Sequence, residues 1–404
     1  MRVGIAFLFK TIAGVRNMKL ARRMSRLGTE TAFEVLAKAR VLEAEGMHVI
    51  HLEIGEPDFE TPSNVIDAGS AALNNGFTHY NPSPGFNDLR DGIAEEISST
   101  RGISVTGDQV VVTPGGKPIM FFTIMALVDQ GDEVLYPNPG FPIYESMIEF
   151  VGGVPVPMRL YESREFGIDV DEVASQITDR TRLMIVNSPN NPCGSIITKE
   201  DLEKLANLAK EHDIAVLSDE IYNRFLYDGD HYSITSFPDM RDRSIILDGF
   251  SKTYAMTGWR IGYGVMPLEL VEPISRLVTN SVSCTASFTQ MAALEALSGS
   301  QDSSNQMVAE FKSRRDIIVE GLNAIPGINC AMPQGAFYVF PNIEGTGMSS
   351  LKFADNLLND GGVACLAGES FGKYGKGYVR FSFANSSENI EEALDRIKNF
   401  VGSR

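Results

Sequence analysis

Short apolar runs rich in β-branched residues recur through the middle of the chain, and longer segments with helical spacing of apolar residues lie between several of them. Nearly continuous apolar strands joined by helices are typical of a mostly parallel sheet that is covered on both faces. The crossovers of such a sheet are right-handed, and its strand ends face a ligand crevice. The predicted strands span 109–113, 132–137, 182–187, 214–219, 244–249 and 260–265, and two of the predicted helices span 117–130 and 200–212.

The two ends of the chain have a different pattern, in which long helices alternate with short strands. The expected elements are helices over 30–46, 303–323 and 386–401 and strands over 48–55, 335–342, 362–368 and 378–384. We predict a smaller α+β domain built from residues 28–60 and 295–404, packed against a large α/β domain of residues 61–294. Residues 1–27 are interpreted as a non-secretory extension, because Lys10 interrupts their apolar run.

Composition and charge narrow the possible partners. The chain has 404 residues, enough for two or three domains of roughly 100–200 residues each. Its 35 Lys and Arg and 52 Asp and Glu give a formal net charge of −17. Nucleic acid and anionic membranes bind basic faces, so neither is expected as a partner.

No apolar run reaches the roughly 20 residues of a membrane span. The four cysteines are widely separated and lack zinc-binding spacing, which predicts reduced thiols, a cytoplasmic location and no metal site.

The segment LDGFSKTYAMTGWRIGYG (247–264) carries the most specific chemistry. Lys252 follows a predicted strand end beside Ser251, and Arg260 comes eight residues later. A primary amine forms a Schiff base with an aldehyde, and an arginine pairs bidentately with a phosphate. Taken alone, a lysine at this position would usually be a solvated surface charge. Together these residues indicate an aldehyde cofactor that bears a phosphate, a description that pyridoxal phosphate fits.

Further polar residues stand at or after the ends of predicted strands. Asp219 ends the run IAVLSD, where a partly buried carboxylate could keep a pyridinium nitrogen protonated. Tyr222 lies three residues further and could hydrogen-bond to the phenolic oxygen of the same ring. Asn191 lies in the turn VNSPNNPCGS, and its amide can donate and accept at once. Taken singly, Asp219 and Asn191 could also serve only to shape their turns.

A glycine pair precedes the predicted helix in VVTPGGKPIMFF (111–122). Backbone N–H groups at a helix N-terminus bind phosphate, and Gly115 and Gly116 would allow close approach. The segment matches neither the dinucleotide-binding fingerprint nor the nucleotide-binding P-loop. Phe141 in PNPGFPIY is a candidate to stack on a flat ring, or else an ordinary core residue.

In this order, the motifs resemble the class I and II aminotransferases of pyridoxal-phosphate fold type I, and most closely the bacterial aspartate aminotransferases. The likeness runs from about residue 28 to the C-terminus. It is carried by IGEPDFETP, HYNPSPGFNDLRDGIA, NSPNNPCG, SDEIY and SKTYAMTGWRIGYG. The resemblance implies an α/β fold with a mostly parallel, seven-stranded sheet in the large domain, bound pyridoxal 5′-phosphate and a homodimer.

The resemblance also implies roles around the cofactor ring. Lys252 would bond covalently to the cofactor and then carry the proton between the substrate Cα and the cofactor. Asp219 would pair with the pyridine nitrogen. Tyr222 and Asn191 would contact the ring oxygen, and Phe141 would stack on the ring.

The cofactor phosphate would be held by a separate group of residues. Within one subunit, the resemblance assigns it to the amides of Gly116 and Lys117, to Ser251 and to Arg260. Tyr80 would reach the phosphate of the neighbouring subunit, so that the site would need a homodimer.

A third group would bind the substrate. Arg380 would take its α-carboxylate through the planar fork of the guanidinium, helped by Asn191 and the backbone of Gly55. In the related aspartate enzymes a lysine at the position of Lys117 and a serine near the N-terminus help to bind the distal carboxylate. The serine position aligns with Glu30, whose negative charge would repel an acidic side chain.

Two further departures from the family pattern concern the cofactor loops. Gly249 stands where the family often has a serine before the reactive lysine, so one hydroxyl to the phosphate is missing. Cys193 stands where threonine is usual, in a turn that the surrounding prolines and glycine shape.

The predicted function is therefore pyridoxal-phosphate-dependent transamination by a ping-pong mechanism. The donor is an L-amino acid, with aspartate or a similar acidic amino acid as the first candidate, and the acceptor is a 2-oxo acid such as 2-oxoglutarate. Alanine, aromatic or methionine-type donors and a lyase reaction on the same fold remain open. A transcriptional regulator with this fold would need a DNA-binding domain, and the residues ahead of the likeness are too few for one.

Overall fold

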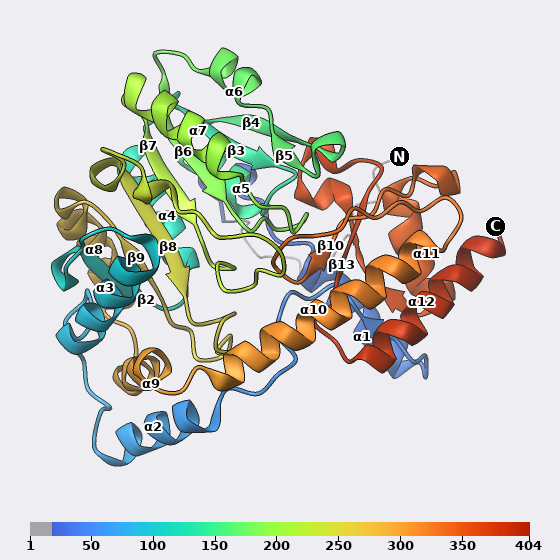
Figure 1. Ribbon diagram of the computed structural model, residues 1–404, viewed down its shortest axis with the longest axis horizontal. Coiled ribbons are helices and arrows are strands. Elements are labelled where there is room, and N and C mark those ends of the chain that lie inside the picture. Colours follow the sequence, from blue (N-terminus) through green and yellow to red (C-terminus); the bar gives the residue numbers. More distant parts are fainter. Residues whose placement is uncertain (1–17) are drawn as a thin grey trace.

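An eight-stranded sheet forms the centre of the computed structural model, which describes residues 18–404 (Figure 1). The strand order is β2-β9-β8-β7-β6-β3-β4-β5. The neighbours from β8 to β4 pair in parallel, whereas β9 is antiparallel to β8 and β2, and β5 is antiparallel to β4. The strands are β2 (Val110–Thr113), β3 (Glu133–Asn138), β4 (Val154–Tyr161), β5 (Gly167–Ile168), β6 (Thr181–Asn187), β7 (Ala215–Asp219), β8 (Ser244–Gly249) and β9 (Gly262–Val265).

The prediction of a mostly parallel, helix-covered sheet is confirmed, but the sheet has eight strands instead of seven. β4 contains Pro155 and Pro157, which lack an N–H and disrupt a strand-like pattern. Prolines two residues apart remove N–H groups from the same side of a strand, which a strand near the sheet edge tolerates. β5 has only two residues, too few to show a periodicity.

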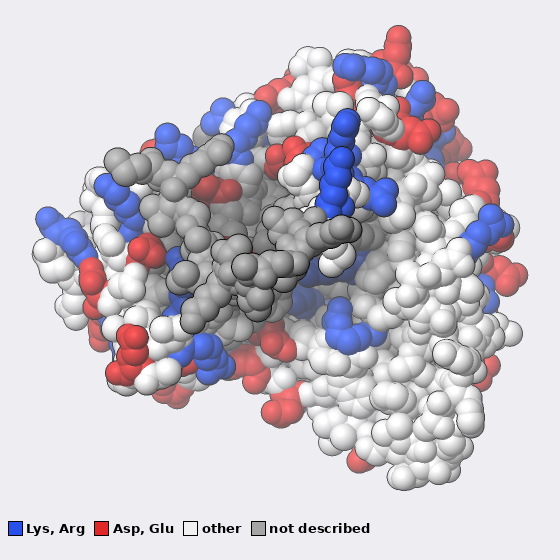
Figure 2. All heavy atoms as spheres, turned by 180° about the vertical axis from the view of Figure 1, so that it is seen from behind, with Lys and Arg blue, Asp and Glu red and all other residues white. Residues whose placement is uncertain are grey.

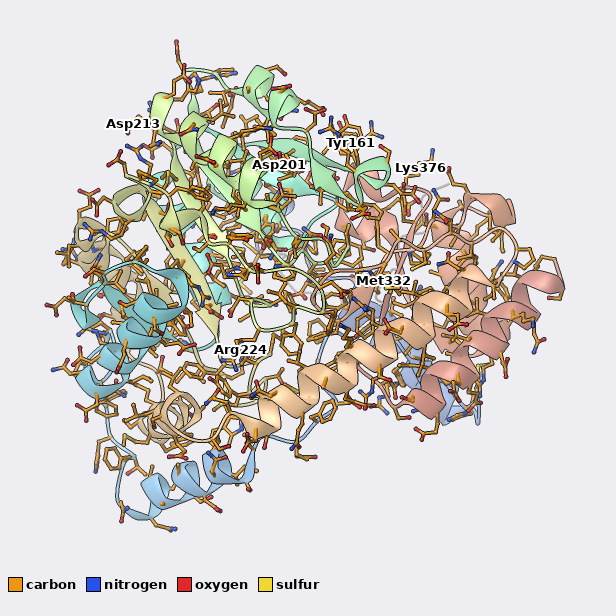
Figure 3. All side chains as sticks on the ribbon, viewed as in Figure 1. Tyr161, Asp201, Asp213, Arg224, Met332 and Lys376 are labelled. Atoms are coloured by element: carbon orange, nitrogen blue, oxygen red, sulfur yellow. The ribbon has the colours of Figure 1, made fainter. Side chains whose placement is uncertain are left out.

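Helices cover both faces because successive residues of the central strands point to opposite sides. Leu183 and Ile185 of β6 pack in one apolar cluster with α4, α5 and α8, whereas Met184 and Val186 pack in another with α7. The helices around this sheet are α2 (Ser63–Asn74), α3 (Asn87–Arg101), α4 (Lys117–Leu127), α5 (Ile143–Val151), α6 (Val170–Gln176), α7 (Lys199–Glu211), α8 (Leu268–Val282) and α9 (Ser287–Ser298). Side chains fill the space between sheet and helices (Figure 3).

The chain ends meet in two small sheets. β1 pairs in parallel with β11, and β13 lies between β10 and β12 in an antiparallel sheet. These strands are β1 (Ile50–His51), β10 (Tyr338–Val339), β11 (Val363–Ala364), β12 (Leu366–Ala367) and β13 (Val379–Ser382), and the helices beside them are α1 (Ala32–Ala44), α10 (Asp302–Asn323), α11 (Ser350–Gly361) and α12 (Ser387–Gly402). Figure 1 shows α1 beside the C-terminal helices. The domain limits of 28–60 with 295–404 and 61–294 stay a prediction.

Short 3-10 helices connect several of these elements. They are η1 (Arg22–Arg26), η2 (Gly107–Gln109), η3 (Glu162–Arg164), η4 (Ile234–Ser236), η5 (Arg241–Arg243), η6 (Glu344–Thr346), η7 (Gly368–Phe371) and η8 (Lys373–Gly375). Of the predicted extension, residues 1–17 lie outside the described residues. The part that follows is held on α5, where Arg26 Nε donates to Glu149 O at 2.7 Å and Gly28 N donates to Ser146 Oγ at 2.8 Å.

On the face in Figure 2, Lys and Arg side chains lie among Asp and Glu side chains. No helix within residues 18–404 is long and apolar enough to cross a membrane.

A buried ionic cluster joins α3 to the ends of β7 and β8. Arg101 donates to Glu220 at 2.9 Å through Nε and to Asp248 at 3.1 Å through a terminal nitrogen. Asn223 Nδ2 donates to Asp248 at 2.7 Å. The side chains of Arg101, Glu220 and Asp248 are all less than a tenth exposed. This cluster therefore lies directly behind the turns that carry Asp219 and Lys252.

Replacing Arg101 by Met is expected to lower the free energy of unfolding by about 3–5 kcal/mol, because two buried carboxylates lose their cation. Urea unfolding followed by circular dichroism measures this change. Arg276→Met is the control, since Arg276 pairs with Glu272 on the exposed side of a helix, and less than about 1 kcal/mol is expected there. Equal effects of the two substitutions would contradict the stabilising role of the cluster.

Candidate active site

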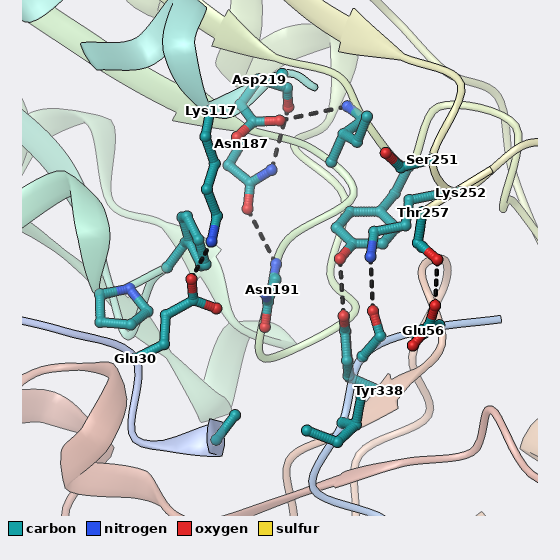
Figure 4. A pocket seen from close by; sticks show the side chains of 18 of the residues that line it. Glu30, Glu56, Lys117, Asn187, Asn191, Asp219, Ser251, Lys252, Thr257 and Tyr338 are labelled. Atoms are coloured by element: carbon teal, nitrogen blue, oxygen red, sulfur yellow. Dashed lines mark hydrogen bonds and ion pairs between the residues drawn. The ribbon is translucent and has the colours of Figure 1, made fainter. Parts of the chain in front are cut away.

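A cavity of about 530 Å³ lies where the carboxyl ends of β6, β7 and β8 meet the small sheets (Figure 4). Parallel strands place the residues at their carboxyl ends along the same sheet edge, where ligands bind. Eleven of the twelve predicted site residues line this cavity; they are Gly55, Gly116, Lys117, Phe141, Asn191, Asp219, Tyr222, Ser251, Lys252, Arg260 and Arg380. Tyr80 is the exception. It lies in the loop between α2 and α3, does not line the cavity and is 89% exposed.

Lys252 supplies the amine of the cavity. It lies three residues beyond the end of β8, and its Nζ donates to Gly55 O at 2.6 Å. Burial lowers the pKa of Lys252 to about 8, and the positive charge of Arg380 acts in the same direction. A larger fraction of this amine is therefore neutral, and able to attack an aldehyde, than for an exposed lysine.

Asp219 supplies a buried carboxylate at the end of β7. Tyr144 donates a hydrogen bond of 2.5 Å to its Oδ2, and the backbone N–H of Ile221 donates to Oδ1. Burial raises the pKa of Asp219 to about 6, so the group is mostly ionised at neutral pH. Among residues 18–404, no Lys, Arg or His forms an ion pair with it. The carboxylate is thus able to hold a positively charged ring nitrogen.

Two tyrosines meet below the amine. The hydroxyls of Tyr222 and Tyr338 are 2.7 Å apart and hydrogen-bonded. Burial raises the pKa of Tyr222 well above its ordinary value, which keeps this phenol protonated and able to donate. Gly55 lies against Tyr338, and any Cβ at Gly55 would collide with the Tyr338 hydroxyl.

Arg380 supplies a buried guanidinium on β13. One terminal nitrogen donates to Asn191 Oδ1 at 3.0 Å and the other donates to Glu53 O at 2.5 Å. Its Nε is buried without a hydrogen-bond partner, and within the described chain no carboxylate forms an ion pair with it. A buried cation that lacks an anion is strongly disfavoured, so this geometry fits an anionic group of a ligand.

The predicted phosphate loop combines a helix N-terminus with a nearby cation. Gly116 is the N-cap of α4, and Arg260 and Ser251 line the same part of the cavity. Gly115 has φ +87°, and a Cβ there would collide with the Arg260 guanidinium. Glycine is therefore required for the helix end and Arg260 to approach each other.

The departure at Gly249 has a packing reason. Gly249 pairs with Gly262 across β8 and β9, and a Cβ on Gly249 would lie 3.0 Å from the Gly262 Cα. A serine at this position would crowd the neighbouring strand. Cys193 is buried in its turn, as the surrounding prolines and glycine allow.

Lys117 and Glu30 form an ion pair at the wall of the cavity (Figure 4). Both residues line the cavity, and Lys117 Nζ lies 5.5 Å from the centroid of the Phe141 ring. The alignment of Glu30 with a substrate-facing position therefore agrees with its place in the fold. Lys117, which is expected to bind the distal carboxylate of a substrate, is therefore already paired with the carboxylate of Glu30.

Three residues of the site were not identified from the sequence. Tyr144 hydrogen-bonds to Asp219, and Tyr338 hydrogen-bonds to Tyr222. Asn187 donates to the backbone oxygen of Asp219 at 3.1 Å and accepts from Asn191 N at 3.0 Å. Asn187 could have been identified from the sequence, because it is a polar residue at the end of an apolar strand, as Asp219 is. Tyr144 and Tyr338 lie in apolar patterns that carry no such signal.

The donor set fits pyridoxal phosphate. An amine of lowered pKa, an unpaired buried carboxylate, an arginine beside a helix N-terminus and an unpaired guanidinium open into one cavity. Within the described residues, no three His, Cys, Asp or Glu side chains are grouped as metal ligands would be.

Comparisons with known proteins agree with this geometry. The family model "Aminotransferase class I and II" matches residues 47–397. The "Aromatic-amino-acid aminotransferase 2" of Thermococcus litoralis and the "Aspartate aminotransferase" of Pyrococcus abyssi are each 40% identical to this chain, over 89% of it and 93% of their own length. The solved structure of an alanine aminotransferase from Pyrococcus furiosus matches 96% of this chain and 100% of its own, with 38% identity and a TM-score of 0.91.

These matches span most of the chain and most of each relative. The chain belongs to the class I and II aminotransferases, which are enzymes that depend on pyridoxal phosphate, and it adopts their α/β fold.

Proposed function

We propose that this aminotransferase takes the amino group of an L-amino acid, with aspartate or a similar acidic amino acid as the first candidate, and transfers it to a 2-oxo acid such as 2-oxoglutarate. The two half-reactions use one site in turn. The carrying observation is that the amine of Lys252 shares a cavity with two unpaired buried charges, Asp219 and Arg380. A relative named for aspartate supports the donor.

When bound, pyridoxal phosphate supplies an aldehyde and a ring that withdraws electrons from the substrate Cα. Lys252 Nζ would hold the aldehyde end of the cofactor and would move the proton of the substrate Cα. Asp219 would hold the protonated ring nitrogen. Tyr222 and Asn191 would donate to the ring oxygen, and Phe141 would lie against the ring.

The remaining residues position the phosphate and the substrate. The amides of Gly116 and Lys117, the Ser251 hydroxyl and Arg260 bind the phosphate. Arg380 binds the substrate α-carboxylate with Asn191 and the Gly55 backbone, and Lys117 binds a distal carboxylate in competition with Glu30, its ion-pair partner. Arg380 is suited to this role because Asn191 and Glu53 orient its fork and leave Nε free.

The test of this function is a spectrum of the holoenzyme during single half-reactions. Single L-amino acids are added without any oxo acid, and the visible band of the lysine-bound cofactor is followed. Loss of this band with formation of the aminated cofactor supports transamination, and the fastest donor identifies the substrate. Release of pyruvate and ammonia without an acceptor would support a lyase instead.

The variant Lys252→Ala is expected to lose turnover by about 10²–10⁴-fold, because it removes the amine that moves the Cα proton in the proposed mechanism. Steady-state transamination measures the loss, and circular dichroism checks that the fold is retained. Turnover equal to that of the parent enzyme would refute the assignment of Lys252.

The pKa of Lys252 predicts how cofactor binding depends on pH. The neutral amine attacks the aldehyde, and its fraction increases as pH rises through the pKa of about 8. The rate at which apoenzyme takes up pyridoxal phosphate should therefore rise with pH and be half-maximal near pH 8. Stopped-flow absorbance measures this rate. A midpoint close to the ordinary lysine value of 10.5 would contradict the effect of burial.

The homodimer is part of this proposal. Tyr80 is 89% exposed, although its neighbour Asn81 is tied down by hydrogen bonds to Thr285 O and Ser287 Oγ. A second cavity adjoins the active site and shares Thr257 and Arg260 with it. An exposed tyrosine on an anchored loop and an open hollow beside the phosphate loop support the entry of the partner subunit's Tyr80.

Hybrid dimers test this arrangement. In a dimer of one Tyr80→Ala subunit and one Lys252→Ala subunit, one site has both Lys252 and the Tyr80 of the partner subunit. Mixing equal amounts should give about a quarter of the parent activity, since half of the dimers are hybrids with one intact site each. Activity no greater than the mean of the two separate variants would show that Tyr80 does not act across the interface.

A cytoplasmic location is also proposed. All four cysteines are free, and three of them are buried. Free thiols support a reducing compartment.

A further inference from the structure

The ion pair of Glu30 and Lys117 lies inside the site and is the only ion pair between two cavity-lining side chains in the described part of the chain. The Glu30 side chain is 21% exposed and that of Lys117 is 48% exposed. Glu30 is also the cavity carboxylate nearest to the chain start, from a segment that precedes α1. The pair therefore combines a charge from α4 with one from a distant part of the sequence.

The segment that carries Glu30 is anchored at Gly28 by contacts other than the ion pair. Gly28 N donates to Ser146 Oγ at 2.8 Å, and Ser146 Oγ donates back to Gly28 O at 3.3 Å. These hydrogen bonds fix the segment on α5, which packs beside α4. Phe141, five residues before Ser146, lines the same cavity. The position of Glu30 thus follows from packing of the backbone and does not depend on the ion pair alone.

The pair changes the charge that a substrate side chain meets. An unpaired Lys117 would attract a distal carboxylate, whereas the pair has no net charge. An acidic substrate must separate Lys117 from Glu30 and then lie beside the Glu30 carboxylate. Phe33, Phe141, Leu366 and Phe371 line the same cavity, so an uncharged side chain can be buried there with the pair intact.

We propose that Glu30 is a specificity-determining residue, which neutralises Lys117 and shifts the donor preference from acidic towards uncharged, including aromatic, amino acids. This inference rests on the proposed function of the same site. Relatives of equal identity are named for aspartate and for aromatic amino acids, so both donor classes occur at this level of similarity.

Binding of two non-reactive acids to the holoenzyme tests the proposal. Succinate represents an acidic substrate, and 3-phenylpropionate represents an aromatic one of single charge. In Glu30→Gln, the ratio of the succinate dissociation constant to the 3-phenylpropionate dissociation constant should fall about tenfold, because Lys117 loses its competing carboxylate. Isothermal titration calorimetry measures both constants. An unchanged ratio would overturn the proposal.

Glu34→Gln is the matched control. Glu34 lies four residues from Glu30, is exposed and does not line the cavity. The substitution removes the same charge from the same part of the chain. A ratio that shifts as much in Glu34→Gln as in Glu30→Gln would show a general effect of net charge and would also overturn the proposal.

A double-mutant cycle tests whether Glu30 acts through Lys117. In a Lys117→Met background, Glu30→Gln should change the ratio much less than in the parent enzyme. An undiminished change would show that Glu30 repels the substrate directly and that the pair is not the cause.

The half-reactions separate this inference from the proposed function. If no amino acid converts the cofactor, the proposed function fails, while the binding ratio still tests Glu30. If amino acids do convert it, the ratio of the conversion rate with phenylalanine to the conversion rate with aspartate should fall in Glu30→Gln. Conversion with an unaltered preference would refute the role of Glu30 alone.

Discussion

The parallel pairing of β6, β7 and β8 is the constraint on which the site depends. Asn187 pairs with Asp219 across the first two strands, and Asp219 pairs with Leu247 across the next. Since the strands end at one edge, the turns that follow them bring Asn191, Tyr222 and Lys252 to one cavity. A shift of one residue in this register would turn Asp219 to the other face of the sheet.

The adjacent carboxylates of Asp219 and Glu220 have different roles, because one faces the cavity and the other is paired within the protein. Glu220 is paired with Arg101 and receives hydrogen bonds from Ser218 and Ser233, so its charge is satisfied within the protein. Within residues 18–404, the carboxylate of Asp219, the preceding residue, accepts hydrogen bonds only from Tyr144 and the backbone N–H of Ile221. The fold thus stabilises the paired cluster behind the turns and keeps an unpaired carboxylate in front of them, where a ligand can pair with it.

The same division applies to the cations. Arg101 is enclosed by carboxylates, whereas Arg380 is equally buried but its hydrogen-bond partners among the described residues are neutral oxygens. Lys117 is intermediate, because it has a carboxylate partner, Glu30, but this ion pair lies inside the cavity where a ligand can reach it. The substrate carboxylate expected at Arg380 meets no competitor, and one expected at Lys117 does. In this site, therefore, the α-carboxylate that all amino acids share meets an unpaired cation at Arg380. A charged substrate side chain meets Lys117, which is already paired with Glu30.

The class of fold and most of the chemical groups of the site could be predicted from the amino-acid sequence alone. The pattern of apolar strands predicted the central sheet, and the positions of Asp219 and Lys252 at or just after strand ends marked them as candidates. Both patterns are local, so they can be recognised in the sequence. The sequence pattern missed β4, whose prolines are tolerated only through its place near the sheet edge. It also missed Tyr144 and Tyr338, since an apolar pattern does not reveal where a hydroxyl points. Only the tertiary structure decided that Glu30 meets Lys117, because that contact spans 87 residues and depends on how the segment before α1 packs on α5.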